Sequence, residues 1–425
     1  MGKHRTSPCG SSHFDPVSLL RRALQIYLPF LLLLALLRPN LSAQNLARMV
    51  SVMTKDMSTA DEPADNPRNE DKSQEDQQDQ GQTKKKKRKI PDGVIVAPIP
   101  ISSPAIGTGA VVVGGYIFPF NRKDKVSPAS TVGGAYFDTD NGTHGFALAG
   151  ELFISENRYH ITTIYVHGNI NYDFYGTGVE VGAAGLRVPV RQTGQIFLGE
   201  SLRRLKWRFF VGPRVIAGSS TITLRNEPAA IAGAPIPPDV GLQTQLTGLG
   251  FRVNRDTRIN RFYPKQGSYV DLTTMFFSEV LGSKYDFEPF KFTANWYQGL
   301  TAKQVLAYNL YTCATWGTPP FYGECIYGSN NELRGYIGGK HIDRYMLATQ
   351  VEYRLLLPWR LGLVAFGGLG EVASSFDQFR YRNILPAGGV GLRLKLSQKY
   401  GVNLRADIAR GRDGHTFSMG IGEAF

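Results

Sequence analysis

The sequence has few long apolar runs. Its 425 residues are 42% apolar, and their mean hydropathy is −0.20, whereas every span of a helical membrane protein needs about 20 mostly apolar residues. Only residues 23–37 come close to such a span. The sequence therefore excludes a membrane protein built from several helices.

Cysteines and the common signatures of catalysis are also scarce. Three cysteines, none in a Cys-x-x-Cys pair, exclude a scaffold stapled by many disulfides and a zinc site of that kind. The seven histidines lack the His-Glu-x-x-His spacing of metal ligands. Neither a Gly-x-Ser-x-Gly nucleophile motif nor a phosphate-binding loop occurs. We therefore expect no enzymatic activity, no cofactor and no metal ion.

Glycine and aromatic residues, in contrast, are abundant. The chain has 47 glycines, 20 tyrosines and 24 phenylalanines, and its glycine content of about 11% exceeds the usual value of roughly 7%. No Gly-X-Y period is present, which excludes collagen. This composition favours β-structure with tight turns.

The N-terminal region has the pattern of a secretory signal peptide. A pair of arginines precedes the apolar residues 23–37, and Ala43 provides a small residue at a plausible cleavage point. The 15 apolar residues would rise about 22 Å as a helix, which is short of a hydrocarbon core of about 30 Å. An uncleaved anchor is the alternative, and Pro29 and Arg38 disfavour it. We expect residues 1–43 to be removed on export to an oxidising compartment.

Residues 44–93 differ sharply in composition from the rest of the chain. An acidic, glutamine-rich stretch at 61–79 is followed by six consecutive basic residues at 84–89, which supply much of the net charge of +13. With so few large apolar residues this segment is predicted to be disordered. Behind an export signal the basic run indicates a solvated tether rather than a nucleic-acid site, with binding to anionic headgroups or periplasmic partners as the alternative.

Residues 94–425 repeat an alternation of apolar and polar positions, the period of β-strands. Sixteen segments of about ten residues are predicted, the length of a tilted membrane-spanning strand. They begin near Ile106, Ala129, Thr143, Tyr159, Gly178, Arg191, Trp207, Asp239, Gly267, Pro289, Ala302, Met346, Leu361, Ala387, Gly401 and His415. A soluble β-sandwich would also alternate. Because the chain carries an export signal and an even number of strands, we predict an all-β fold, a 16-stranded antiparallel transmembrane β-barrel.

Four segments of the C-terminal half carry motifs. They are residues 255–267, which include Asp256-Thr257-Arg258-Ile259-Asn260, the loop motif Leu333, Arg334, Gly335 and Tyr336, the strand motif 351–354, and residues 392–407 at the C-terminal end. In this order they resemble motifs of the BamA/TamA family of bacterial surface-antigen barrels. The motifs cover roughly residues 240–425, and the strand pattern extends the resemblance back to residue 94.

The resemblance implies that the long loop between strands 11 and 12, residues 313–345, folds back into the lumen. In the family its arginine pairs with carboxylates on the barrel wall. Here we expect Arg334 to pair with Glu352 and Asp407, because strand alternation turns both carboxylates inward. A guanidinium can donate two parallel hydrogen bonds to a carboxylate. A solvated turn around Arg334 is the alternative. The sequence departs from the family at Gly368, where an aspartate is usual.

Two further features concern the loop and the end of the chain. Cys313 and Cys325, expected together in the loop of an exported protein, are predicted to form a disulfide; two free thiols are the alternative. Phe417, Met419, Ile421 and Phe425 alternate along the last predicted strand. In outer-membrane barrels a terminal aromatic residue on such a strand is the signal that the assembly machinery reads.

The resemblance implies a non-enzymatic role in inserting or exporting proteins, or lipids, at the cell outer membrane. Family members that do so usually carry POTRA domains of about 75 residues each before the barrel, and residues 44–93 do not supply one, so we identify a short member without POTRA domains. The expected partners are outer-membrane lipids, unfolded outer-membrane or secreted proteins, a periplasmic partner, and the assembly machinery for its own insertion. The alternative is a passive pore or a structural barrel that has lost assembly activity.

Overall fold

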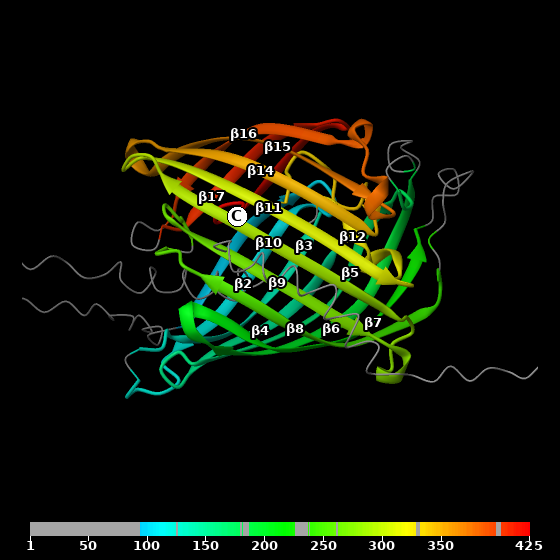
Figure 1. The fold of residues 1–425 in the computed structure, drawn as a ribbon, viewed down its shortest axis with the longest axis horizontal. Coiled ribbons are helices and arrows are strands. Elements are labelled where there is room, and N and C mark those ends of the chain that lie inside the picture. The colour runs from blue at the N-terminus through cyan, green and yellow to red at the C-terminus, as the bar shows by residue number, and fades with distance from the viewer. Residues whose placement is uncertain are drawn as a thin grey trace, which may run out of the picture. The chain divides into compact units, whose positions relative to one another are not determined.

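The computed structural model describes residues 94–425, apart from residues 125, 179–180, 182–186, 226–236, 238, 261, 329–331 and 397–400. The predicted signal peptide (1–43) and charged segment (44–93) lie outside the described residues. In the described part, sixteen antiparallel strands close into one barrel (Figure 1). The strands are β1 Val94–Ser103, β2 Gly107–Phe118, β3 Ser130–Thr139, β4 His144–Ile154, β5 Tyr159–Phe174, β6 Val188–Arg204, β7 Phe209–Leu224, β8 Gln243–Asp256, β9 Gly267–Phe277, β10 Phe287–Gly299, β11 Gln304–Gly317, β14 Tyr345–Leu356, β15 Leu361–Ala373, β16 Leu385–Lys395, β17 Asn403–Gly411 and β18 Gly414–Ile421.

The remaining elements are short. β12 (Cys325–Ile326) and β13 (Ile342–Asp343) pair with each other inside the connection between β11 and β14. Single 3₁₀ turns occupy Lys206–Arg208, Glu279–Leu281, Phe321–Gly323, Pro358–Arg360, Phe376–Gln378 and Tyr381–Asn383. Among the described residues, no helix is long and apolar enough to cross a membrane.

The two faces of the wall differ in polarity, as the alternation predicts. On β14, Gln350, Glu352 and Arg354 are buried on the inner face, whereas Leu347 and Val351 are 47% and 40% exposed on the outer face. Large aliphatic and aromatic residues are exposed on the outer faces of β4, β15, β16 and β17 as well. An apolar outer face with polar residues inside is the arrangement of a barrel surrounded by lipid.

The predicted number of barrel strands is confirmed, but two strand positions were wrong. The first strand is β1, which begins at Val94 rather than near Ile106, and it contains Pro98 and Pro100. In the described part of the chain no strand lies between β5 and β6 in the barrel, because these two pair directly up to Phe174 and Val188. The prediction thus missed β1 and included a strand near Gly178 that the structure does not show in its described residues, so that the total of sixteen was still correct. Proline lacks a backbone N–H, which is why it weakens a strand pattern.

The end of the chain also differs from the expected alternating strand. β18 stops at Ile421, and Gly422 has a φ of +84°, a left-handed conformation that turns the backbone out of the strand. Phe425 is therefore not part of β18. The strand does close the barrel, because β18 lies next to β1. In the described residues the register of this contact comprises one pair, Ser102 with Met419.

Candidate functional site

The long loop, residues 318–344, is fixed to the wall at its base by a disulfide. Cys313 bonds to Cys325, as expected from the sequence. Cys313 lies in wall strand β11 rather than in the loop, because β11 extends to Gly317, whereas Cys325 begins β12. The bond therefore joins the loop to the wall. Within the loop, β12 and β13 form a two-stranded antiparallel sheet.

Beyond the disulfide, the loop packs against the inner face of β14, β15 and β16. Tyr327, Leu333 and Tyr336 are buried in one apolar cluster with side chains of these strands. The Tyr327 hydroxyl donates to the carbonyl of Leu385 at 3.2 Å, and the Tyr336 hydroxyl donates to that of Pro386 at 2.6 Å. These bonds satisfy the only polar atoms of the two side chains, so that the rings can be buried at little cost.

Glycines allow the loop and the wall to approach each other at two points. Gly335 has a φ of +115°, and a Cβ there would lie 3.0 Å from the Cβ of Ala387. At Gly368 a Cβ would lie 2.7 Å from Leu333 Cδ1 and 2.2 Å from the carbonyl oxygen of Thr349. Any side chain at 368 would therefore displace the loop. This contact accounts for the glycine at 368.

Arg334 lies at the centre of the site. Its Nη1 donates to Asp407 Oδ2 at 2.8 Å, its Nη2 pairs with Glu352 Oε2, and its Nε donates to Gln350 Oε1 at 3.1 Å. The guanidinium carbon lies 3.5 Å from the centre of the Phe366 ring. The contacts of Arg334 with Glu352 and Asp407 expected from the sequence are thus present, and the side chain is 5% exposed.

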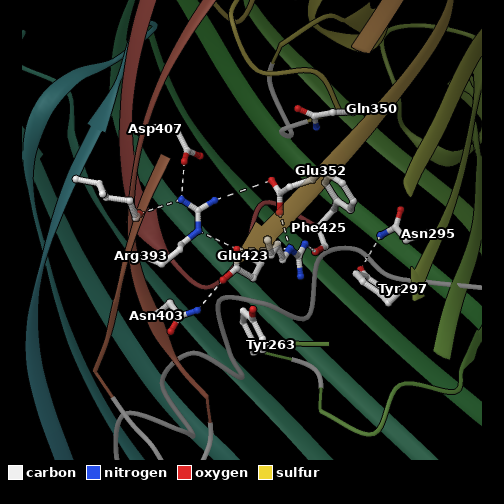
Figure 2. A network of polar contacts seen from close by, with 12 residues as sticks. Tyr263, Asn295, Tyr297, Gln350, Glu352, Arg393, Asn403, Asp407, Glu423 and Phe425 are labelled. Atoms are coloured by element: carbon white, nitrogen blue, oxygen red, sulfur yellow. Dashed lines mark hydrogen bonds and ion pairs between the residues drawn. The ribbon is translucent and has the colours of Figure 1, made fainter. Parts of the chain in front are cut away.

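The two carboxylates extend this contact into a larger network (Figure 2). Glu352 Oε1 accepts from Arg354 Nε at 2.6 Å, and Asp407 Oδ1 accepts from Arg393 Nη1 at 2.6 Å. Arg393 Nε also donates to Glu423 Oε2 at 2.8 Å. The network therefore runs from the loop through the wall to the segment that follows β18.

This last segment turns inward and is held by the same arginines. Glu423 Oε1 accepts from the Asn403 side-chain amide at 2.6 Å, and the backbone oxygen of Phe425 accepts from Arg354 Nη2 at 2.9 Å (Figure 2). The Phe425 ring lies 5.6 Å from the Arg354 guanidinium carbon. Phe425 thus contacts the interior network rather than continuing the outer apolar face with Phe417, which is 47% exposed. Met419 and Ile421 remain in β18.

The network is rich in cations. Arg405, directly opposite Arg393 in the register of β16 and β17, adds a fourth buried arginine to Arg334, Arg354 and Arg393. The carboxylates among these contacts are three: Glu352, Asp407 and Glu423. A buried charge needs a partner, so removing a carboxylate from such a cluster should cost more than removing an arginine.

Two ionisable residues of the loop have shifted pKa values. Burial raises the pKa of the Glu324 carboxyl to about 7, and the nearby Asp343 carboxylate acts in the same direction. Burial lowers the pKa of His341, although its Nε2 lies 2.7 Å from Asp413 Oδ2. Among the described residues, no group of three or more His, Cys, Asp or Glu side chains is arranged to hold a metal ion.

Sequence reasoning did not identify three contributors to the site. Gln350 carries no charge and matches no motif, Phe366 matches the first position of the strand motif that contains Gly368 but was assigned no role, and Glu423 was expected within the last strand. Gly422 was a usable signal for Glu423, because glycine readily adopts the left-handed conformation that turns a chain out of a strand.

Comparison with known proteins places this geometry in context. Residues 127–425 match the Omp85 superfamily domain. The fold is similar to BamA from Haemophilus ducreyi lacking POTRA domains 1–3, with a TM-score of 0.53, 14% identity, and coverage of 78% of this chain and 70% of that one. It is also similar to CdiB from Acinetobacter baumannii (TM-score 0.51, 12% identity, 77% of this chain and 59% of that one) and CdiB from Escherichia coli (0.50, 12%, 76% and 61%).

The chain therefore spans about 60% of the length of the two CdiB proteins. No curated protein matches the chain.

Proposed function

The chain belongs to the Omp85 superfamily, and from this we propose that it inserts or exports proteins at the outer membrane by opening its barrel between β1 and β18. The fold is that of an outer-membrane barrel. The action would be non-enzymatic: the wall itself would guide a polypeptide into or across the membrane. We further propose that residues 1–43 are cleaved on export, that an unfolded outer-membrane or secreted protein is the client, and that a periplasmic partner delivers it.

The pairing of β1 and β18 is the observation that carries the proposal. Among the described residues its register comprises one pair, Ser102 and Met419, whereas β1 pairs with β2 at ten positions and β17 pairs with β18 at eight. At about 1 kcal/mol net per backbone hydrogen bond, opening this junction costs far less than separating any other pair of strands. An unpaired strand edge is also a template on which another strand can add.

The sequence of β1 supports a weak junction. Pro98 and Pro100 are two positions apart, so their missing N–H groups fall on the same side of the strand. β1 pairs continuously with β2 from Val94 to Ser103. We infer that the missing donors lie on the β18 side, where they reduce the number of hydrogen bonds available to close the barrel.

The interior network acts next to this junction. Arg334 ties the loop to β14 and β17, and Arg393 ties the segment after β18 to β16 through Glu423. We propose that Arg334, Glu352 and Asp407 are positioning residues: they hold the loop against the fixed part of the wall while β18 moves. Cys313 and Cys325 would keep the base of the loop in place during this movement.

A disulfide across the junction tests the proposal. The variant Ser102→Cys/Met419→Cys joins residues that face each other across β1 and β18. The protein is reconstituted in phospholipid vesicles, and folding of a urea-denatured eight-stranded outer-membrane protein is followed by its heat-modifiable migration in gels. We expect the oxidised variant to lose its acceleration of client folding and dithiothreitol to restore it.

Two controls make the result specific. The pair Ala135→Cys/Ala147→Cys locks β3 to β4, which stay together in the proposal, and should leave the acceleration unchanged. Wild-type protein with dithiothreitol accounts for reduction of the native disulfide. If unlocked protein does not accelerate folding, the proposal is wrong, and conductance of the same vesicles would then favour the passive pore.

A further inference from the structure

Two hairpin turns share an unusual sequence and backbone. Trp207 and Arg208 connect β6 to β7, and Trp359 and Arg360 connect β14 to β15. All four residues have a positive φ, at 57° and 64° in the first turn and 69° and 80° in the second. These values match the two central residues of a type I′ turn, where Asn-Gly is the usual choice.

The two turns are also closed by the same hydrogen bond. The N–H of Leu205 donates to the carbonyl of Phe209 at 2.7 Å, and the N–H of Leu357 donates to that of Leu361 at 2.9 Å. In each turn an aliphatic residue precedes and an apolar residue follows the pair by the same spacing. The two turns therefore have the same local structure.

Packing within the protein does not account for tryptophan at these positions. A bulky side chain at positive φ is strained, and that strain is not offset by packing, because Trp207 is 79% exposed and Trp359 is 92% exposed. At the same end, the turn from β4 to β5 uses the small or polar residues Ser155, Glu156 and Asn157 at positive φ. Strained residues that the fold does not require are a sign of function.

Both turns lie at the same end of the barrel. Neighbouring strands are antiparallel, so every second connection falls at one end, and four strands separate the two hairpins along the wall. The longer connections, including residues 318–344, lie at the opposite end. In bacterial outer-membrane barrels the short turns face the periplasm.

The two ends differ in charge. Among the described residues, the seven connections at the end with the tryptophans contain nine lysines and arginines against two acidic residues, Asp124 and Glu156. The described residues of the eight connections at the opposite end include nine basic and nine acidic ones. The end that carries both exposed tryptophans is therefore the one that attracts anions.

We propose that these two turns bind the headgroup layer of an anionic phospholipid leaflet, with phosphatidylglycerol-like lipids as the ligand. The indole ring of each tryptophan lies at the boundary between headgroups and acyl chains, where tryptophan is enriched in membrane proteins. The neighbouring Arg208 and Arg360, both exposed, contact the lipid phosphates. Leu361 and Leu363, 46% and 43% exposed on the outer face after the second turn, continue the surface into the acyl region.

Such binding would fix the depth of the barrel at two separated points of the wall. Arg255 supports the first of them, because its Nε donates to the carbonyl of Trp207 at 2.8 Å and so holds the turn in place. The inference does not depend on the insertion activity proposed above.

Fluorescence of single-tryptophan proteins tests the proposal. The chain has four tryptophans, so Trp296→Phe/Trp316→Phe/Trp359→Phe leaves Trp207, and the matching triple variant leaves Trp359. Each protein is reconstituted in phosphatidylcholine vesicles with one-fifth phosphatidylglycerol, and heat-modifiable migration shows that it is folded. We expect brominated lipid to quench both tryptophans and aqueous iodide to have little effect.

The choice of lipid is tested in the same vesicles by placing the bromine on phosphatidylglycerol or on phosphatidylcholine. We expect brominated phosphatidylglycerol to quench Trp207 more strongly than its fraction of the total lipid would predict. Arg208→Gln should lower the association constant of phosphatidylglycerol for this turn about fivefold, the equivalent of ~1 kcal/mol per basic residue at a membrane surface. Arg382→Gln is the matched control, because this exposed arginine follows the 91% exposed Tyr381 at the opposite end.

Two results would overturn the proposal. If iodide quenches Trp207 and Trp359 while brominated lipid does not, the turns face water or a protein rather than lipid. If both lipids quench in proportion to their share, the turns lie in the membrane without selecting an anionic headgroup.

Discussion

Because the network holds more arginines than carboxylates, we predict that removing a carboxylate destabilises the barrel more than removing an arginine. Glu352→Gln keeps the size of the side chain but removes one of three carboxylates that face four arginines. Arg334 would keep Asp407, and Arg354 would keep Glu423 at 3.8 Å. An additional buried positive charge would remain without compensation, and breaking a buried ion pair in this way costs about 3–5 kcal/mol of unfolding free energy.

Removing the arginine should cost less. In Arg334→Met, Glu352 keeps Arg354 at 2.6 Å and Asp407 keeps Arg393 at 2.6 Å, so both carboxylates remain paired. The loss is that of hydrogen bonds to charged groups, about 1.5–3 kcal/mol each, and no buried charge is left without a partner, which is the cost that dominates in Glu352→Gln. The double variant should be less unstable than the sum of the two single ones, because the residues are in direct contact.

Urea unfolding in phospholipid vesicles, followed by heat-modifiable migration, measures these differences. Val351→Ile on the outer face of β14 is the control, and its effect should be within about 0.5 kcal/mol. If Arg334→Met proves more destabilising than Glu352→Gln, the scarcity of carboxylates does not determine the stability of the network, and the prediction is wrong.

Three further predictions concern the loop. Gly368→Ala should release the loop from the wall and cost about 1–3 kcal/mol, because its Cβ would lie 2.7 Å from Leu333 Cδ1 of the loop, in addition to 2.2 Å from the carbonyl oxygen of Thr349 in the wall. Cys313→Ser/Cys325→Ser should increase proteolysis within the loop, since it removes a cross-link worth about 3 kcal/mol in the chain-entropy model. Because the pKa of Glu324 is raised to about 7 from 4.5, its contribution to loop stability is complete below pH 4.5 and is lost as the pH rises through 7. Proteolysis of the loop should therefore increase over that range, and Glu324→Gln should remove the dependence.

Each of these predictions has a matched comparison. Gly367→Ala should be tolerated, since the atom nearest to its Cβ would be 3.7 Å away; equal destabilisation by both alanines would show that the loop contact is not the cause. Two alkylatable thiols at Cys313 and Cys325 in unreduced protein would contradict the disulfide. A pH dependence that persists in Glu324→Gln would assign the effect to another group, of which His341 is the nearest candidate in the loop.

The sequence predicted the barrel because a strand facing lipid on one side carries its own signal. Val390, Leu392 and Leu394 alternate with Gly391, Arg393 and Lys395, and the aliphatic residues are the exposed ones in the structure. β1 gives no such signal, because its two prolines interrupt the pattern. We infer that their missing N–H groups face β18, a partner that comes from the other end of the chain.

The candidate site was predicted in part for a similar reason. The inward direction of Glu352 and Asp407 follows from strand parity alone, and the position of Arg334 came from a resemblance in sequence. Phe366 and Glu423 could not be found in that way. Their contacts depend on how far the loop enters the barrel and on where β18 ends.

Composition and period determined that this chain forms β-strands with one apolar face, because each of those properties belongs to a segment of a few residues. Only the closed barrel decided which charges meet. Arg334, Glu352, Asp407 and Glu423 are far apart along the chain, and they share a network because the wall curves around the loop and leaves buried charges no water to pair with. The same closure brought β1 to β18. The antiparallel order of the strands gathered the basic turns and both exposed tryptophans at one end, an arrangement that no single segment encodes.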